Sequence, residues 1–149
     1  MNTTQNARAQ YGITLLRVMV GIIFIMHGGM KLFGMGVDAT AGFFGQIGIP
    51  LAYASAVLVI AVELVGGAFL VAGLLTRFVT PLTAATMVGA IVTVHGSKGF
   101  FLPDGYEFAL LLLVASVALF LTGSGALALD NVLARRGRRA EPALAPTLA

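Results

Sequence analysis

The chain has 149 residues, of which 58% are hydrophobic and only 10% are charged. Soluble domains carry about 25% charged residues, so this composition excludes a water-facing surface and predicts a one-domain integral membrane protein. The net charge of +3 comes from four C-terminal arginines with no aromatic residues among them, which argues against nucleic-acid binding. Because cysteine is absent, the chain cannot supply disulfides, thiolate metal sites or iron–sulfur ligands.

Four apolar segments predict membrane-spanning helices, because each approaches the length that the hydrocarbon core of a bilayer requires. They cover about residues 11–33, 51–75, 79–95 and 106–123. Residues 1–10 are polar and predict a disordered N-terminus, and residues 131–149 predict a basic, disordered cytoplasmic tail. The ordered part is therefore predicted to be a four-helix transmembrane domain at residues 11–130.

The connections between these segments carry their own signals. In the glycine-rich stretch 34–50, Phe43, Phe44 and Ile47 share one helical face, which predicts a small helix in the membrane interface. The later sequence Pro103-Asp104-Gly105 is typical of a tight turn, because proline fixes φ and glycine accepts positive φ.

Helices are favoured over strands because the segments lack period-2 alternation and four strands cannot close a barrel. The predicted fold is therefore an all-α membrane protein, a four-helix transmembrane bundle. An even number of spans places both termini on one side. That side holds Arg8, Arg77 and the C-terminal arginines, whereas Lys31 and Lys98 lie opposite. The positive-inside rule then predicts that both termini are cytoplasmic.

Two segments share a sequence pattern that suggests an internal repeat. Met19-Val20-Gly21-Ile22-Ile23 followed by His27-Gly28 matches, in register, Met87-Val88-Gly89-Ala90-Ile91 followed by His95-Gly96. A true repeat would relate two helix pairs by an axis along the membrane normal. It would also place His27 and His95 at similar depth, where they could flank one pocket. Chance similarity among apolar residues is an equal alternative.

His27 and His95 are the candidate residues for ligand binding or proton relay. Two facing imidazoles could hold a haem, or they could pass protons to a quinone. The structural alternative is that each imidazole bonds a backbone carbonyl or a glutamate and locks the bundle. Both readings stay open at this point.

Glu63 is the most informative single residue, because a carboxylate near the middle of a span must be protonated or paired with a cation. Arg17 and Lys31 are the candidate cations by depth, and both are also candidates for holding a ligand. Lys31 is favoured to snorkel to the headgroups, as lysines at span ends commonly do. A structural ion pair and a proton-handling role for Glu63 stay equally open.

Glu107 opens the fourth segment beside the Pro-Asp-Gly turn. It is either an acid stabilised by the helix dipole or a partner for Lys31 or His95.

The arginines near the C-terminus favour an anchor for anionic lipids, with docking of a cytoplasmic protein as the alternative. The sequence shows no phosphate-binding glycine loop, dinucleotide fingerprint, metalloprotease motif or nucleophile elbow, so no metal site and no bound cofactor is predicted from a motif.

Taken together, these residues resemble the DoxX family over about residues 12–130. The resemblance is carried by Leu16-Arg17, His27-Gly28 and Lys31-Leu32-Phe33-Gly34, then by Glu63, Gly66-Gly67, Gly73 and Thr76-Arg77, and finally by His95-Gly96, Gly99-Phe100-Phe101 and Gly105-Tyr106-Glu107. It implies a small four-helix, multi-pass protein of the bacterial inner membrane. The family is named for a subunit associated with quinone-linked oxidoreductases, including a thiosulfate:quinone oxidoreductase, and distant relatives act in the maturation or assembly of other membrane proteins.

Three functional hypotheses follow. The first is a membrane subunit of a quinone-linked oxidoreductase, in which the polar cluster contacts quinone and a protein partner supplies electrons. The second is a non-catalytic assembly or anchoring subunit of a membrane complex, whose buried charges hold the bundle together. The third is a small-solute transporter, for which the chain has few spans. Whether the chain is catalytic stays open, and its certain contact is the lipid bilayer.

Overall fold

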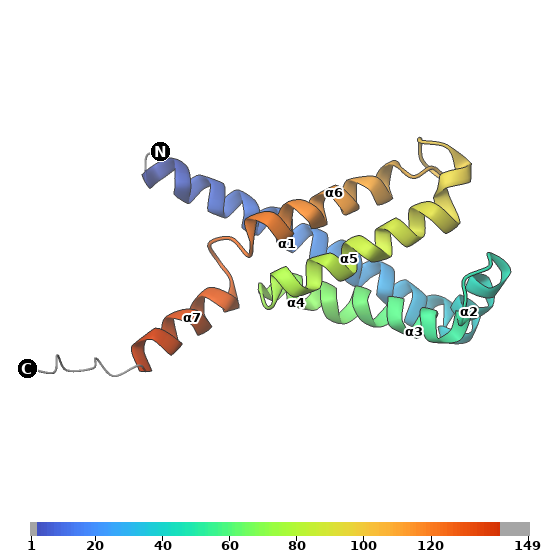
Figure 1. The fold of residues 1–149 in the computed structure, drawn as a ribbon, viewed down its shortest axis with the longest axis horizontal. Helices are drawn as coiled ribbons and strands as arrows, with labels where there is room; N and C mark the ends of the chain where they lie inside the picture. Colours follow the sequence, from blue (N-terminus) through green and yellow to red (C-terminus); the bar gives the residue numbers. More distant parts are fainter. Residues whose placement is uncertain (1–2, 141–149) are drawn as a thin grey trace, which may run out of the picture.

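The computed structural model describes the backbone of residues 3–140 and the side chains of residues 4–135. Within this range the chain forms helices and turns, with no strand (Figure 1). The α-helices are α1 (Thr3–Gly29), α2 (Val37–Gln46), α3 (Ala52–Ala61), α4 (Gly67–Ala72), α5 (Thr76–Ala90), α6 (Glu107–Thr122) and α7 (Leu129–Ala140). Three π-helical turns and one 3₁₀ turn lie between them, at Met30–Met35, Val62–Gly66, Ile91–His95 and Gly96–Lys98. The predicted all-α class is therefore confirmed.

Three continuous helices are long and apolar enough to cross a membrane. They are Thr4–Met35, Ala52–Ala72 and Thr76–Lys98. The fourth apolar helix, α6, has 16 residues, which is shorter than the roughly 20 residues that a straight crossing needs. The described residues thus form an all-helical protein whose three to four apolar helices fit a membrane bundle.

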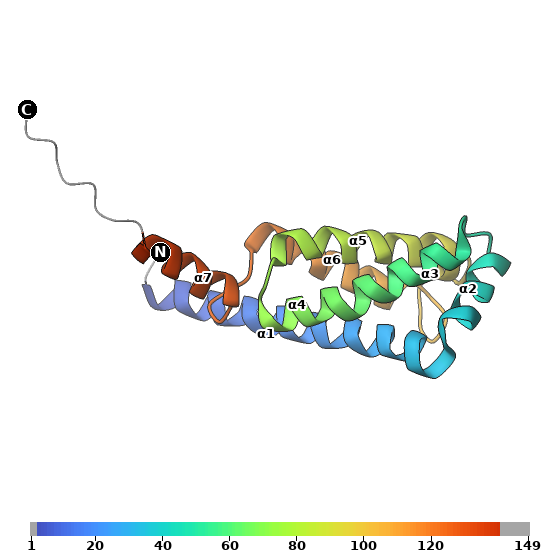
Figure 2. The same cartoon turned by 90° about the horizontal axis from the view of Figure 1, so that it is seen from below.

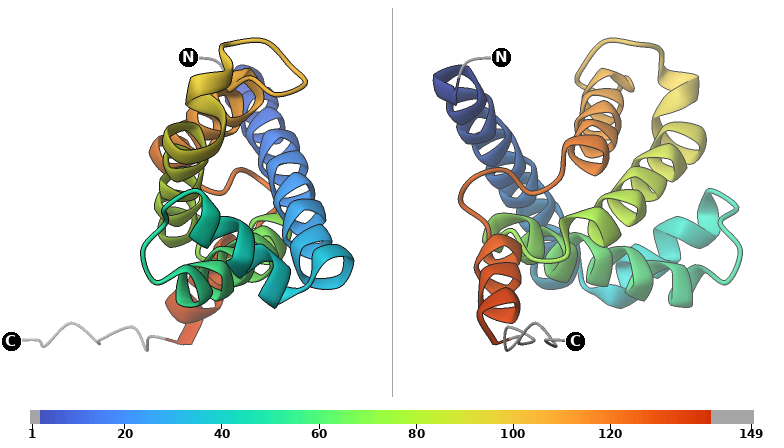
Figure 3. Two further views of the ribbon diagram at one scale, coloured as in Figure 1. Left: turned by 90° about the vertical axis from the view of Figure 1, so that its right-hand side faces the viewer. Right: turned by 60° about the vertical axis from the view of Figure 1, so that its left-hand side comes forward.

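The helices run back and forth along the bundle. α1 leads from the end that holds the start of α1 and α7 to the opposite end, where α2 lies, and α3 and α4 return (Figures 1 and 2). α5 then runs from the end near α7 toward the end where α2 lies, and α6 returns beside it (Figure 1). Seen along the bundle, α1 lies on one side and the α5–α6 pair on the other (Figure 3, left).

α1 crosses α4 at a point where neither helix has room for a side chain. A Cβ on Gly21 would lie 2.7 Å from the carbonyl oxygen of Gly67, and a Cβ on Gly67 would lie 2.8 Å from that of Gly21. Lipid is as apolar as the side chains, so helices in a membrane gain little from the hydrophobic effect and depend on close packing of this kind.

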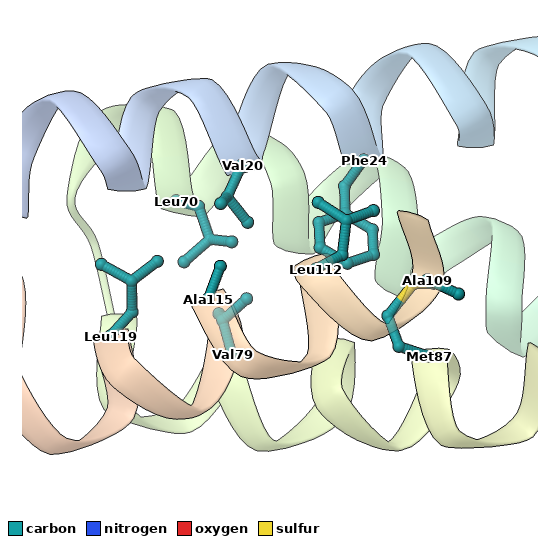
Figure 4. Packing of buried hydrophobic residues seen from close by; sticks show 9 residues of the cluster. All are labelled: Val20, Phe24, Leu70, Val79, Met87, Ala109, Leu112, Ala115 and Leu119. Carbon is teal, nitrogen blue, oxygen red and sulfur yellow. The ribbon is translucent and has the colours of Figure 1, made fainter. Parts of the chain in front are cut away.

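The main core lies between α1, α4, α5 and α6 (Figure 4). Its nine buried residues are Val20, Phe24, Leu70, Val79, Met87, Ala109, Leu112, Ala115 and Leu119. A buried hydrogen bond of 3.1 Å from the hydroxyl of Thr83 to that of Ser116 also links α5 to α6. Such polar bonds between helices stabilise membrane bundles modestly.

The predicted disorder at the N-terminus is wrong from Thr3 onward, because α1 begins there. The segment before Tyr11 contains no glycine or proline, so nothing interrupts a helix that the apolar span already stabilises. Residues 1–2 lie outside the described range.

The predicted disorder after residue 130 is also wrong for its first part, since α7 covers Leu129–Ala140. Leu129, Val132 and Leu133 follow helical spacing, which gives this short helix one apolar face. The part of the predicted tail at residues 141–149 lies outside the described range.

The suggested internal repeat is not reproduced in the packing of the matched residues. Met19 is 52% exposed whereas Met87 is 8% exposed, and Val20 is 2% exposed whereas Val88 is 47% exposed. The matched positions therefore face different surroundings, and the similarity does not extend to how α1 and α5 pack.

Candidate functional site

A cavity of about 960 Å³ lies in the half of the bundle that includes α2. Its walls come from the second half of α1, from α2 and α3, from α5 and from the start of α6. Most of the lining is apolar, including Phe24, Phe44 and Leu112. Leu58 of α3 and Leu82 of α5 also line it and are exposed, so the cavity opens sideways between these two helices.

Lys31 and Glu63 form an ion pair at this cavity. The Lys31 Nζ donates to both carboxylate oxygens of Glu63, at 2.7 Å to Oε2 and 2.9 Å to Oε1. The side chain of Glu63 is 3% exposed and that of Lys31 is 19% exposed. The expectation that Lys31 snorkels to the headgroups is therefore wrong, because the nearby carboxylate offers its ammonium a buried partner. Of the two cations considered for Glu63, Lys31 is the one that pairs with it.

Close helix packing brings the two charges together. A Cβ on Gly28 would lie 2.9 Å from the Cβ of Glu63 and 2.9 Å from the Cγ of Leu64. The π-turn that carries Glu63 therefore packs directly on Gly28, with no room for a side chain between them. Lys31 lies in the π-turn that follows α1, and its ammonium reaches back to the carboxylate.

Three of the candidate residues lie in π-helical turns. Lys31 belongs to Met30–Met35, Glu63 to Val62–Gly66 and His95 to Ile91–His95. A π-turn inserts an extra residue and rotates the following side chains relative to a regular helix, and such turns are frequent at functional sites. Here all three of these residues also line the same cavity.

His27 and His95 both line the cavity, although the internal repeat from which a shared pocket was hypothesised is not reproduced in the packing. Nδ1 of His27 lies 2.9 Å from the carbonyl oxygen of Ile23, and Nδ1 of His95 lies 2.8 Å from that of Asp104. A carbonyl oxygen can only accept, so Nδ1 carries the proton in each ring. Nε2 is then the basic nitrogen of each neutral imidazole, free to accept a proton or bind a ligand.

The other two sequence candidates lie apart from the cavity lining. Arg17 is fully buried near the opposite end, where its guanidinium donates to four carbonyl oxygens. Glu107 lies in the first turn of α6, and its Oε1 accepts a 2.8 Å hydrogen bond from the amide of Leu102. Among the described residues, the only ion pair is Lys31–Glu63, so Glu107 pairs with neither Lys31 nor His95.

Two contributors to the site carry no signal in the sequence. Phe108 stacks on His27, with ring centroids 6.0 Å apart and an angle of 28° between the planes. Thr40 of α2 is buried, and its hydroxyl donates to the carbonyl oxygen of Gly36 at 2.9 Å. One is an ordinary phenylalanine in an apolar span and the other an ordinary threonine in a short helix, so only the fold assigns them to the cavity.

Comparisons with known proteins agree with this architecture. The DoxX family model matches residues 12–96. A Bacillus subtilis protein named "Putative oxidoreductase CatD" is 46% identical over 127 residues, which cover 84% of this chain and 89% of that protein. An uncharacterized Haemophilus influenzae protein is 33% identical, with 88% of this chain and 96% of the relative covered.

An uncharacterized membrane protein of Mycobacterium tuberculosis is 31% identical, with 88% of this chain and 86% of the relative covered. No solved structure matches the chain. The family match spans more than half of the sequence, and these relatives are covered over most of their length. The chain therefore belongs to the DoxX family of membrane proteins.

Proposed function

We propose that this chain is a membrane subunit of a quinone-linked oxidoreductase and that the cavity receives the quinone ring. The observation that carries this proposal is the Lys31–Glu63 ion pair, because both charges lie in a mainly apolar cavity inside a membrane protein. Charged groups at membrane depth are costly and by default suggest function. The name of the Bacillus subtilis relative, an oxidoreductase, supports the same class.

The cavity suits a lipophilic ring with polar oxygens. Its volume of about 960 Å³ lies near the upper end of the roughly 300–1,000 Å³ of small-molecule sites. Phe24, Phe108 and Leu112 provide apolar walls, and the Lys31 ammonium is a donor for a carbonyl oxygen. The sideways opening between α3 and α5 would admit a molecule that is dissolved in the bilayer.

The residues of the cavity can also handle protons. A quinone takes up two electrons and two protons when it becomes a quinol. His27 and His95 each keep Nδ1–H on a backbone carbonyl, so Nε2 of each ring can accept a proton and pass it on. Glu63 is the third candidate carrier, because its carboxylate lies at the same cavity, where it pairs with Lys31.

The electrons would come from a protein partner. The chain contains no cysteine, so it offers no thiolate for an iron–sulfur cluster. A donor subunit that docks on the bundle would complete the reaction, and this chain would contribute the membrane-embedded quinone site.

We further propose four spans in a bacterial inner membrane, with both termini in the cytoplasm. α1 begins and α7 lies at the same end of the bundle (Figure 1). That end also holds Arg8, Arg77 and Arg135, which the positive-inside rule places in the cytoplasm. The cavity then lies in the outer half of the membrane.

The decisive experiment measures binding of a short-chain quinone to the full chain in mild detergent by equilibrium dialysis. Glu63→Gln and Lys31→Met are expected to weaken binding by about tenfold each, equivalent to the loss of one good polar interaction. Asp38→Asn and Lys98→Met remove exposed charges outside the cavity and should bind like the wild type. Unchanged binding by folded Glu63→Gln would contradict the proposal.

The anchoring hypothesis remains the second candidate, favoured by one observation. Lys31 satisfies both oxygens of Glu63 without any ligand, so the pair can act purely as a structural link between two helices. On that hypothesis an organic extract of the purified protein contains no quinone, its absorption spectrum shows no haem band, and every activity of the intact complex survives Glu63→Gln.

A further inference from the structure

A second cavity, of about 810 Å³, lies at the end of the bundle where α1 begins and α6 ends. Its walls come from the start of α1, the start of α5, the loop after α6 and the start of α7. Two exposed arginines line it, Arg77 on α5 and Arg135 on α7. Neither guanidinium has a hydrogen-bonding or ionic partner among the side chains and backbone that the structure describes.

A buried hydroxyl in the same wall also lacks a partner. Thr76 is 1% exposed and lines this cavity, and its Oγ1 makes no hydrogen bond with the described residues. The neighbouring backbone amides are already used, because the Asp130 carboxylate accepts from the amide of Leu75 at 2.9 Å and from that of Thr76 at 3.4 Å. The acid is thus engaged at the start of α5, whereas the two arginines and the hydroxyl are free for a ligand.

The position of the cavity indicates what that ligand is. α4 ends at Ala72, α5 begins at Thr76 and α6 ends at Thr122, so the cavity lies where three apolar helices reach the membrane surface. Lipid headgroups occupy this depth. Two cationic side chains and a hydroxyl at headgroup depth match the charge and the acceptor oxygens of a phosphodiester.

α7 adds an apolar surface beside these charges. Leu129, Val132 and Leu133 are exposed in the structure although all three are large and hydrophobic. The sequence places Arg136, Arg138 and Arg139 after Arg135 on the same helix. Exposed apolar residues next to a run of arginines on a short helix are typical of segments that lie in the interface of an anionic membrane.

Hydrogen bonds hold the start of α7 at the bundle. The Asn131 side-chain amide donates to the carbonyl oxygens of Gly125 and Ala126, at 2.7 and 3.2 Å, and the Asp130 amide donates to that of Gly73 at 3.0 Å. Arg135 is therefore presented to the cavity by a fixed helix start.

From these observations we infer that the cavity binds the headgroup of an anionic phospholipid, with Arg77 and Arg135 on the phosphate and Thr76 as an additional donor. The bound lipid would also cover the apolar face of α7. This site is separate from the quinone cavity and does not depend on it.

The test is native mass spectrometry of the full chain in mild detergent, mixed with equal amounts of phosphatidylglycerol and phosphatidylcholine that have the same acyl chains. A basic residue near a membrane surface contributes about a fivefold preference for anionic lipid. The wild type should therefore retain at least about fivefold more phosphatidylglycerol than phosphatidylcholine. Arg77→Gln/Arg135→Gln should lose this preference. Arg8→Gln, whose residue is exposed on α1 but does not line the cavity, should keep it.

Equal retention of the two lipids by the wild type overturns the inference, as does an unchanged preference in the double variant. Should the double variant not fold, the lipid preference of Arg135→Gln alone is the deciding measurement, since Arg135 is exposed on α7. Adding millimolar inorganic phosphate to lipid-free protein distinguishes a lipid headgroup from free phosphate as the ligand of the cavity. If phosphate alone raises the melting temperature as much as phosphatidylglycerol does, the site binds free phosphate and the lipid assignment is wrong.

Discussion

The ammonium of Lys31 lies against both carboxylate oxygens of Glu63, at 2.7 and 2.9 Å, although the two residues are 32 positions apart in the sequence. This contact links the π-turn Met30–Met35, which follows α1, to the π-turn Val62–Gly66 between α3 and α4. It also places one positive and one negative charge, both largely removed from water, at the wall of the main cavity.

Removal of one charge from this pair should be costly. Lys31→Met leaves Glu63 buried without a cation, and breaking a buried pair in this way typically costs about 3–5 kcal/mol of the free energy of unfolding. Lys31→Met/Glu63→Gln removes both charges and should recover most of that loss. Chemical or thermal unfolding in detergent measures the difference. Lys98→Met, at an exposed lysine, is the control and should change little. A double variant no more stable than Lys31→Met would show that the charges are not coupled.

Two adjacent glycines should respond differently to a single methyl group. In Gly28→Ala the new Cβ would lie 2.9 Å from Glu63 and Leu64, so overpacking should lower the free energy of unfolding by about 1–3 kcal/mol. The control is Gly29→Ala, because a Cβ there meets nothing within 4 Å. It should be neutral or raise stability by up to about 1 kcal/mol through better helix propensity. Equal melting temperatures for the two variants would argue against the close packing of α1 on Glu63.

The glycines matched by the apparent sequence repeat offer a third test. Gly21→Ala would drive a Cβ to within 2.7 Å of a backbone oxygen of Gly67, whereas Gly89→Ala would meet nothing within 4 Å. The first should destabilise the fold by about 1–3 kcal/mol or more, because backbone cannot move aside easily. The second should be tolerated. Similar losses at both positions, measured by unfolding in detergent, would support a repeat in packing that the structure does not show.

Arg17 should be essential for the loop that leads into α7. Its Nε donates to Ser124 at 2.8 Å, its Nη2 to Leu127 at 2.6 Å and its Nη1 to Val71 at 3.0 Å. Lysine cannot reproduce this planar set of donors, so Arg17→Lys should cost about 3 kcal/mol or more through unpaired carbonyls.

Hydrogen exchange measures where that loss appears. The amide of Ala126, which bonds the carbonyl oxygen of Gln10, should exchange faster in Arg17→Lys. Arg8→Lys, at an exposed arginine, should leave it protected. Unchanged protection of the loop in Arg17→Lys would show that the guanidinium is not what holds it.

Several features of the fold could be predicted from residue types alone. Long apolar stretches have no stable form in a bilayer except helices that satisfy their own backbone, so the all-α class and the approximate positions of the apolar helices follow from composition and length. The ends were less predictable. α1 begins at Thr3, because helical hydrogen bonds continue into the polar sequence before Tyr11, which contains no glycine or proline. α7 is a separate helix at Leu129–Ala140, and it forms although it contains Gly137.

The candidate site was partly visible in the sequence. His27, Lys31, Glu63 and His95 were identified because ionisable residues are rare in apolar spans, and all four line one cavity. The pairing of Lys31 with Glu63, rather than its exposure to headgroups, depends on how α1 approaches the π-turn at Val62–Gly66. No local sequence pattern encodes the distance between the Lys31 ammonium and the Glu63 carboxylate.

By itself, the sequence determined that this is a helical membrane protein and which ionisable residues lie in its spans. Both follow from the cost of placing backbone and charges in hydrocarbon, which each residue meets independently of its distant neighbours. Only the tertiary structure decided that Lys31 neutralises Glu63, that Arg17 and Glu107 lie away from the cavity, and that Phe108 stacks on His27. Those contacts depend on the rotation and crossing of helices, which are set by how closely Gly21 and Gly28 allow their neighbours to pack.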